Sequence, residues 1–234
     1  LRARFHIDEE RVYLTGLSMG GGGTLWLGLT RPDVWAAIAP VCPAPPEGIM
    51  ELAGNASNLP VHLFIGDKDF LFQTAIEWKG KLGETALRLD YAEYPGVGHN
   101  SWEWAYKDGF IFDWFSQFKR DLYPGKVSFT TKWFKYNSAY WVTIDDMIPG
   151  KTATAEAKFT GPNAVTVTVS GINAFTLRLE GHPQFNSSKK VSVNVNGKAF
   201  SVRSADAVSF MLSGGNWINS RFTPGLTSKQ KGAE

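Results

Sequence analysis

The first half of the chain alternates short apolar runs with amphipathic stretches. Strands are predicted from the apolar runs at 11–17, 34–41 and 61–65, and a further strand at 87–94. Helices are predicted between and after these strands. One begins directly after residue 18, and the others lie at 49–52, 74–82 and 102–120. Such alternation of strands and helices is typical of an α/β fold, with a parallel sheet that helices cover on both faces.

From residue 124 onward the period changes to two, and Val, Thr and Phe become frequent. Eight strands are predicted, at 127–134, 139–144, 154–159, 164–169, 175–179, 191–195, 199–202 and 208–212. Asn196-Gly197 predicts a two-residue hairpin between two of them. So many short strands predict an antiparallel β-sandwich. The chain is therefore divided into a partial α/β domain at 1–123, a β-sandwich accessory domain at 124–226 and a mobile tail at 227–234.

A Gly-x-Ser-x-Gly turn follows the first predicted strand. Gly16, Ser18 and Gly20 occupy its fixed positions, and an apolar helical run follows. Such a turn exposes the serine hydroxyl at a sharp strand-to-helix bend, where the helix N-terminus favours negative charge. The two glycines are expected to let strand and helix approach without a Cβ clash. The motif also occurs by chance in loops, so its flanking strand and helix carry the interpretation of Ser18 as a nucleophile.

Two further strands end in polar residues that suit the same chemistry. Asp67 and Asp69 follow the strand at 61–65, and His99 follows the strand at 87–94. The carboxyl ends of parallel strands lie at one edge of a sheet, so these groups are expected near Ser18. The order Ser, Asp, His along the chain differs from the orders of the chymotrypsin and subtilisin triads.

These segments resemble the α/β-hydrolase superfamily, in particular its esterase, feruloyl-esterase and prolyl-oligopeptidase-like members, over about residues 6–120. The resemblance implies a serine hydrolase in which Ser18 is the nucleophile and His99 the general base and then acid. It implies Asp69 as the orienting acid, with Asp67 as the alternative, and the backbone N–H of Met19 as an oxyanion donor. It implies no metal and no cofactor.

The resemblance favours a small-molecule or polymer-linked ester as substrate, and a secreted or periplasmic location over a cytoplasmic one. A peptidase of the prolyl-oligopeptidase type would use the same triad. A non-catalytic binding or scaffold protein is the second alternative. Residues that bind the substrate are not identified, although Trp102, Glu103 and Trp104 follow the catalytic loop.

In α/β-hydrolases several strands precede the nucleophile turn, whereas only about a dozen residues precede that strand here. We therefore expect an upstream polypeptide segment to complete the sheet. Without it the strand at 11–17 is expected to lie at an uncovered edge. The segment that normally supplies a second oxyanion donor is expected to lie upstream as well.

Composition excludes several classes of partner. The formal net charge of the 234 residues is +2 and no basic run is present, which argues against nucleic acid or an anionic membrane as partner. Cys42 is the only cysteine, so no intrachain disulfide can form, and an apolar run before it predicts burial.

Several other residues have structural interpretations. His62 lies within an apolar strand and is expected to be a core residue with its polar atoms satisfied. In the second half, candidates for a sugar- or polymer-binding surface are Trp133, Tyr136, Tyr140, Trp141 and Trp217, although aromatic residues in strands more often pack in the core.

Overall fold

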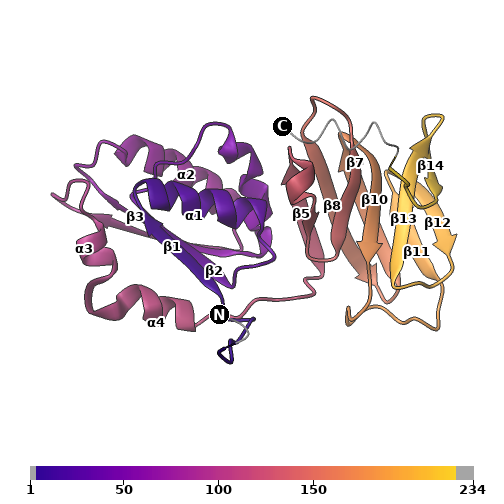
Figure 1. The fold of residues 1–234 in the computed structure, drawn as a ribbon, viewed down its shortest axis with the longest axis horizontal. Coiled ribbons are helices and arrows are strands. Elements are labelled where there is room, and N and C mark those ends of the chain that lie inside the picture. The colour runs from indigo at the N-terminus through magenta and orange to yellow at the C-terminus, as the bar shows by residue number, and fades with distance from the viewer. Residues whose placement is uncertain (1–3, 225–234) are drawn as a thin grey trace. The chain divides into compact units, whose positions relative to one another are not determined.

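The computed structural model describes residues 4–224, so the predicted tail at 227–234 lies outside the described residues. The chain divides into two compact units, Leu1–Leu122 and Tyr123–Glu234 (Figure 1). Within the described range, none of the helices has the length and apolar character needed to cross a bilayer.

The first unit is built on a four-stranded parallel sheet with the order β1-β2-β3-β4. Its strands are β1 (Tyr13–Leu17), β2 (Ala37–Val41), β3 (Pro60–Gly66) and β4 (Arg88–Tyr94). Its helical segments are α1 (Met19–Thr30), η1 (Ile49–Asn58), α2 (Phe72–Thr85), α3 (Trp102–Ala105), η2 (Lys107–Gly109) and α4 (Phe110–Ser116). Among the described residues, β1 pairs only with β2 and therefore forms an edge of the sheet, as expected.

Helices cover both faces of this sheet, which explains why β2 and β3 are buried along their whole length. On one face, Ile38 of β2 packs against Gly28 of α1, where the absent side chain lets the helix approach. On the other face, Ala37 and its alternate neighbours join a core cluster that includes Ile111 and Phe115 of α4. Figure 1 shows α1 and α2 on one side of the strands and α3 and α4 on the other.

The single helix predicted over 102–120 is wrong. The segment forms α3, a short 3₁₀ turn and α4, because the backbone of Asp108 and Gly109 is left-handed, with φ of 52° and 79°. A left-handed residue cannot continue a right-handed helix, and glycine adopts that conformation at little cost. The short helix predicted at 49–52 is instead a ten-residue 3₁₀ segment, η1.

The described part of the second unit forms two five-stranded sheets, with the orders β14-β13-β10-β7-β6 and β12-β11-β9-β8-β5. Buried side chains from both sheets form a single contacting cluster. The strands are β5 (Lys126–Thr131), β6 (Ser138–Ala139), β7 (Val142–Met147), β8 (Ala153–Gly161), β9 (Ala164–Ser170), β10 (Ile172–Arg178), β11 (Val191–Val195), β12 (Lys198–Val202), β13 (Ala207–Ser213) and β14 (Asn216–Asn219), with the 3₁₀ turn η3 (Phe134–Tyr136) between β5 and β6.

The prediction of a purely antiparallel arrangement needs one correction. Strands β9 and β11 are paired in parallel. Between them the chain passes through β10, which belongs to the other sheet. It therefore reverses direction twice before it returns, so β11 runs in the same direction as β9.

Two local predictions in the second unit have opposite outcomes. The Asn196-Gly197 hairpin between β11 and β12 is confirmed, and both residues have positive φ, as the twist of such a turn requires. The single strand predicted at 139–144 is wrong, because Tyr140 is left-handed with φ of 53° and the chain turns there between β6 and β7.

Two of the aromatic residues proposed for a binding surface belong to the core. Trp141 and Trp217 are both buried, and each packs in the cluster shared by the two sheets. The indole N–H of Trp141 donates to the carbonyl of Pro124 at 2.7 Å, which satisfies its one polar atom. These two side chains are therefore unavailable to a ligand.

His62 in β3 gives the first unit a pH-dependent stability. Its ring packs against Phe64 and Trp114, with centroids 4.0 and 5.1 Å away. The expectation that its polar atoms are satisfied is wrong, because Nδ1 is buried without a hydrogen-bond partner among the described residues. Burial lowers the pKa of His62 from 6.5 to about 4.

The unfolded chain therefore protonates His62 at a higher pH than the folded chain does. The resulting stability is complete above pH 6.5 and is lost as the pH falls from 6.5 toward 4. Between pH 7 and pH 4.5 we expect this group to lower the free energy of unfolding of the first unit by about 2 kcal/mol. The His62→Phe variant should lack that share of the pH dependence. Hydrogen exchange of β3 peptides at pH 7 and pH 4.5 measures the change in the free energy of unfolding. An equal change in wild type and in His62→Phe would contradict the assignment to His62.

Candidate active site

Ser18 stands at the bend between β1 and α1 in a strained backbone conformation, with φ of 54° and ψ of −117°. Three hydrogen bonds hold it there. Its N–H donates to the carbonyl of Val41 at 2.9 Å, and its own carbonyl accepts from the N–H groups of Gly22 at 2.9 Å and Ala44 at 3.0 Å. The bend is therefore fixed by β2 and by the segment that follows it.

The two glycines of the turn do not contribute equally. A Cβ on Gly16 would lie 2.4 Å from the carbonyl oxygen of Gly20, so only glycine fits at position 16. A Cβ on Gly20 would meet nothing within 4 Å. The expectation that both glycines prevent a clash is therefore wrong for Gly20. The close approach further along the helix is at Gly22, where a Cβ would lie 2.0 Å from the carbonyl oxygen of Ala44.

The structure brings Ser18, His99 and Asp69 into one hydrogen-bonded chain. Nε2 of His99 lies 2.8 Å from Oγ of Ser18. Nδ1 of His99 lies 3.1 and 2.9 Å from the two carboxylate oxygens of Asp69. The Asp69 side chain is fully buried whereas the His99 side chain is 29% exposed. A ring that Asp69 contacts through Nδ1 can accept a proton through Nε2, which faces the serine.

Asp67, the alternative acid, has a different role. Its Oδ1 accepts the backbone N–H of Gly96 at 2.7 Å, in the loop that leads to His99, and its Oδ2 lies 3.5 Å from Nζ of Lys68. Asp69 is additionally held by the N–H of Leu71, which donates to its Oδ1 at 2.9 Å. Asp67 thus holds the loop that carries the histidine, and Asp69 contacts the imidazole itself.

The His99 loop sits close to the end of β3 because residue 66 is glycine. A Cβ on Gly66 would lie 2.2 Å from the carbonyl oxygen of Val97 and 2.5 Å from that of Gly98. The N–H of Lys68 donates to the carbonyl of Val97 at 2.9 Å and ties the two loops together. These contacts set the distance between the acid and the imidazole.

Met19 begins α1 directly after Ser18, and its side chain is exposed. Because it is the first residue of the helix, its backbone N–H precedes the first intrahelical acceptor. The first N–H groups of a helix are unpaired and attract negative charge. The Met19 N–H is thus free to bind an anionic oxygen beside the serine.

An apolar cavity of about 480 Å³ adjoins this end of α1. Its lining residues are Met19, Gly23, Trp26, Ala44 and Pro46. None of them has a sequence signal for substrate binding, because they come from one face of α1 and from a loop whose packing has no periodic signal. The cavity has the size and character of a small-molecule site.

Aromatic rings flank the imidazole on two sides. Phe70 is 78% exposed, and its ring lies 4.7 Å from that of His99. Trp102 meets His99 edge-on at 5.7 Å, so this tryptophan does border the site, whereas the ring of Trp104 packs against Tyr94. The available sequence signal for Phe70 is a large apolar residue directly after the predicted acid, in a loop.

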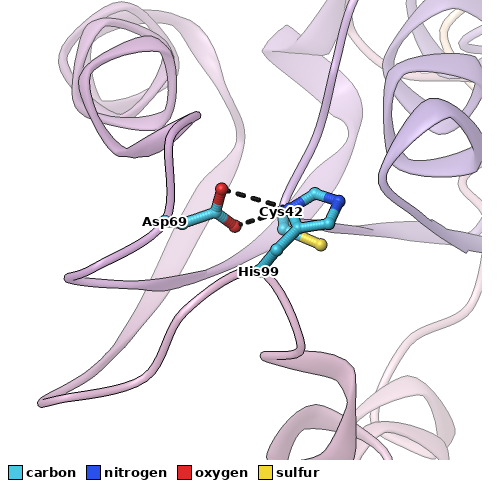
Figure 2. Close-up of side chains that lie close together, drawn as sticks. All are labelled: Cys42, Asp69 and His99. Carbon is cyan, nitrogen blue, oxygen red and sulfur yellow. Dashed lines mark hydrogen bonds and ion pairs between the residues drawn. The ribbon is translucent and has the colours of Figure 1, made fainter.

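Cys42 lies behind the acid and the histidine (Figure 2). Its Sγ and ligand atoms of Asp69 and His99 lie within 4.8 Å of one another, close enough for the three to hold a metal ion. Burial raises the pKa of the Cys42 thiol, so it stays protonated and is a poor ligand near neutral pH. Asp69 and His99 are already hydrogen-bonded to each other, and a metal would have to break that contact. We therefore assign no metal to this cluster.

No protein-family model matches the sequence, and no curated protein matches it significantly. Solved structures match part of it. A thermostable esterase is 27% identical with a TM-score of 0.45, and the match covers 51% of this chain and 34% of the esterase. An S-formylglutathione hydrolase from Staphylococcus aureus is 21% identical with a TM-score of 0.39, covering 49% of this chain and 55% of that chain. A ferulic acid esterase is 18% identical with a TM-score of 0.40, covering 47% of this chain and 55% of that chain.

The structural neighbours are therefore esterases and serine hydrolases, but each likeness is partial. The chain spans about a third of the thermostable esterase and about half of the other two proteins.

Proposed function

We propose that the chain is part of a serine hydrolase of the α/β-hydrolase type that cleaves a carboxylic ester through an acyl-Ser18 intermediate. The observation that carries the proposal is the hydrogen-bonded chain from Ser18 Oγ through the His99 ring to Asp69. A serine hydroxyl is a weak nucleophile by itself, and an adjacent oriented imidazole is the group that activates it.

The geometry supports a two-step acyl transfer. In the first step His99 Nε2 takes the proton of Ser18 Oγ while that oxygen attacks the ester carbonyl carbon. Asp69 keeps the Nδ1 proton and stabilises the imidazolium. The N–H of Met19 stabilises the negative oxygen of the tetrahedral intermediate. Collapse of the intermediate breaks the bond to the alcohol oxygen, which receives its proton from His99.

In the second step a water molecule attacks the acyl-Ser18 carbonyl while His99 takes its proton. Collapse releases the carboxylic acid and returns the proton to Ser18 Oγ. The apolar cavity lined by Met19 and Trp26 suits an apolar acyl or alcohol group of the ester. The groups that carry protons in both steps are Ser18, His99, the leaving alcohol and the attacking water.

A second part of the proposal concerns the free edge of the sheet. Within residues 4–224, the backbone of β1 pairs on one side only, and Leu17 at its end is exposed. An unpaired edge strand offers a row of N–H and C=O groups to another strand. We propose that a strand from another polypeptide segment pairs with β1. We also propose that the second unit is an accessory β-sandwich domain.

The first test is a burst measurement with p-nitrophenyl acetate. The proposal predicts release of about one equivalent of p-nitrophenol per chain, with one acetyl group on Ser18. The Ser18→Ala variant should give neither the burst nor the acetylated protein, and a p-nitroanilide substrate should give a much smaller burst. A burst that persists in Ser18→Ala would refute the nucleophile assignment. A faster reaction with the anilide would favour the peptidase alternative, and no reaction with either substrate or with a fluorophosphonate would favour the scaffold alternative.

A further inference from the structure

The second unit carries a groove of about 760 Å³ on the face of sheet β14-β13-β10-β7-β6 that is turned away from the core. Phe175 and Leu177 of β10 point into the core, so the intervening Thr176 and the following Arg178 lie on the opposite, groove-lining face. Segments after β12 and β14 complete the wall. The groove therefore lies wholly within this unit and is separate from Ser18.

Asp145 is placed in the groove by a β-bulge. The ladder between β7 and β10 passes from Ile144 opposite Phe175 to Asp146 opposite Ala174, which leaves Asp145 as the extra residue. Such bulges redirect a side chain and occur frequently beside functional sites. The carboxylate of Asp145 is therefore an irregular feature of an otherwise regular strand.

A chain of hydroxyl groups orients that carboxylate. Oγ1 of Thr176 donates to Oδ2 of Asp145 at 2.6 Å, and Oγ of Ser209 lies 2.7 Å from the same Thr176 oxygen. Burial raises the pKa of Asp145, whereas Thr176, Arg178 and Arg221 act in the opposite direction. The groove thus holds a preoriented acceptor that is partly withdrawn from water.

Three arginines line the same groove, and the carboxylate of Asp145 is the only acidic side chain among its lining residues, so the lining carries a net positive charge. The side chain of Arg178 is fixed, because its Nε donates to Oγ1 of Thr143 at 3.1 Å and leaves its two terminal nitrogens available. Arg203 and Arg221 are exposed and come from the two segments that wall the groove. The N–H groups of a guanidinium form a planar fork that binds carboxylate or phosphate oxygens.

We propose that this groove binds a small polyhydroxylated anion, such as a sugar acid or a sugar phosphate. The arginines donate hydrogen bonds to the anionic group. Asp145 accepts from ligand hydroxyls. The side-chain oxygens of Asn137 and Asn219, which also line the groove, can accept as well, while their Nδ2 groups donate to the carbonyls of Ile144 and Ser209. The volume suits a molecule of one or two sugar rings. This binding does not depend on the proposed hydrolase activity.

Isothermal titration of the whole chain at low salt tests the proposal with three probes: galacturonate, glucose 1-phosphate and glucose. At least one of the two anions should bind once per chain and at least about tenfold more tightly than glucose. Tighter binding of galacturonate identifies a carboxylate ligand, and tighter binding of glucose 1-phosphate identifies a phosphate ligand. Added salt should weaken either interaction, because the groove is open to solvent.

Variants separate this site from adventitious binding. Arg178→Ala and Arg221→Ala should each weaken anion binding by about tenfold or more. Lys158→Ala removes an exposed cation from β8 in the other sheet and should leave the affinity unchanged. Arg221 lies in a segment outside the strands, so its variant remains informative if Arg178→Ala does not fold. Failure of both anions to bind at about 10 mM, or equal affinity in wild type and both arginine variants, would overturn the proposal.

Discussion

Replacing Asp69 by asparagine is expected to slow the reaction of Ser18 with a fluorophosphonate by about a thousandfold or more. The amide carries no charge and can donate to Nδ1 of His99, which would hold the ring in the tautomer that presents a proton to Ser18. Such a ring cannot accept the proton of the serine. The measurement is the second-order rate constant for covalent labelling, followed by intact-protein mass spectrometry.

Asp67→Asn is the matched control, because it makes the same chemical change two residues away. Its side-chain oxygen can still accept the N–H of Gly96, the contact that Asp67 makes now. We expect its labelling rate to stay within about threefold of wild type. A comparable loss in both variants would mean that the carboxylates act together on the loop, and a larger loss in Asp67→Asn would reverse the assignment of the acid.

Alanine at Gly16 is expected to lower the free energy of unfolding of the first unit by about 3 kcal/mol. The new Cβ would lie 2.4 Å from the carbonyl oxygen and 2.6 Å from the carbonyl carbon of Gly20. Both are backbone atoms at the start of α1, so relief requires β1 and α1 to separate. That movement would also displace Ser18 from His99 and slow labelling. Hydrogen exchange of peptides from β1 and α1 measures the loss of stability.

Gly20→Ala provides the control within the same motif. Its Cβ points into open space, and the residue lies in the first turn of α1. Alanine there should change the free energy of unfolding by less than about 1 kcal/mol. An equal loss in Gly16→Ala and Gly20→Ala would contradict the asymmetry that the structure assigns to the two glycines.

The convergence of Ser18, Asp69 and His99 could be anticipated because each follows a predicted strand of the parallel sheet. Parallel strands bring such ends to one edge of a sheet. The choice between Asp67 and Asp69 could not be settled in the same way, since both follow one strand. It depends on how closely the His99 loop approaches Gly66, a contact between segments about thirty residues apart.

Other features had a local signal that a stronger pattern outweighed. Asp108-Gly109 is a dipeptide typical of turns, but it lies inside an apolar run with helical spacing. The helix nevertheless ends there, because both residues are left-handed. The parallel pair of β9 and β11 had no local signal at all, since it depends on which sheet the intervening strand joins.

The groove of the second unit was likewise outside the reach of sequence patterns. The bulge that turns Asp145 into it is a property of the register between β7 and β10. The aromatic candidates for a binding surface do not line it, and two of them, Trp141 and Trp217, are core residues. Arg178 in β10 and the two arginines outside the strands, Arg203 and Arg221, have no pattern in the sequence that relates them, because only the fold brings them to one groove.

The most direct test of the proposed activity is the site of covalent modification by a fluorophosphonate. The whole chain should take up one equivalent, and peptide mass spectrometry should place it on Ser18, with no uptake by the Ser18→Ala variant. His99→Ala should take up the probe about a thousandfold more slowly. Modification of a different residue, or an unchanged rate in His99→Ala, would contradict an activation of Ser18 by His99.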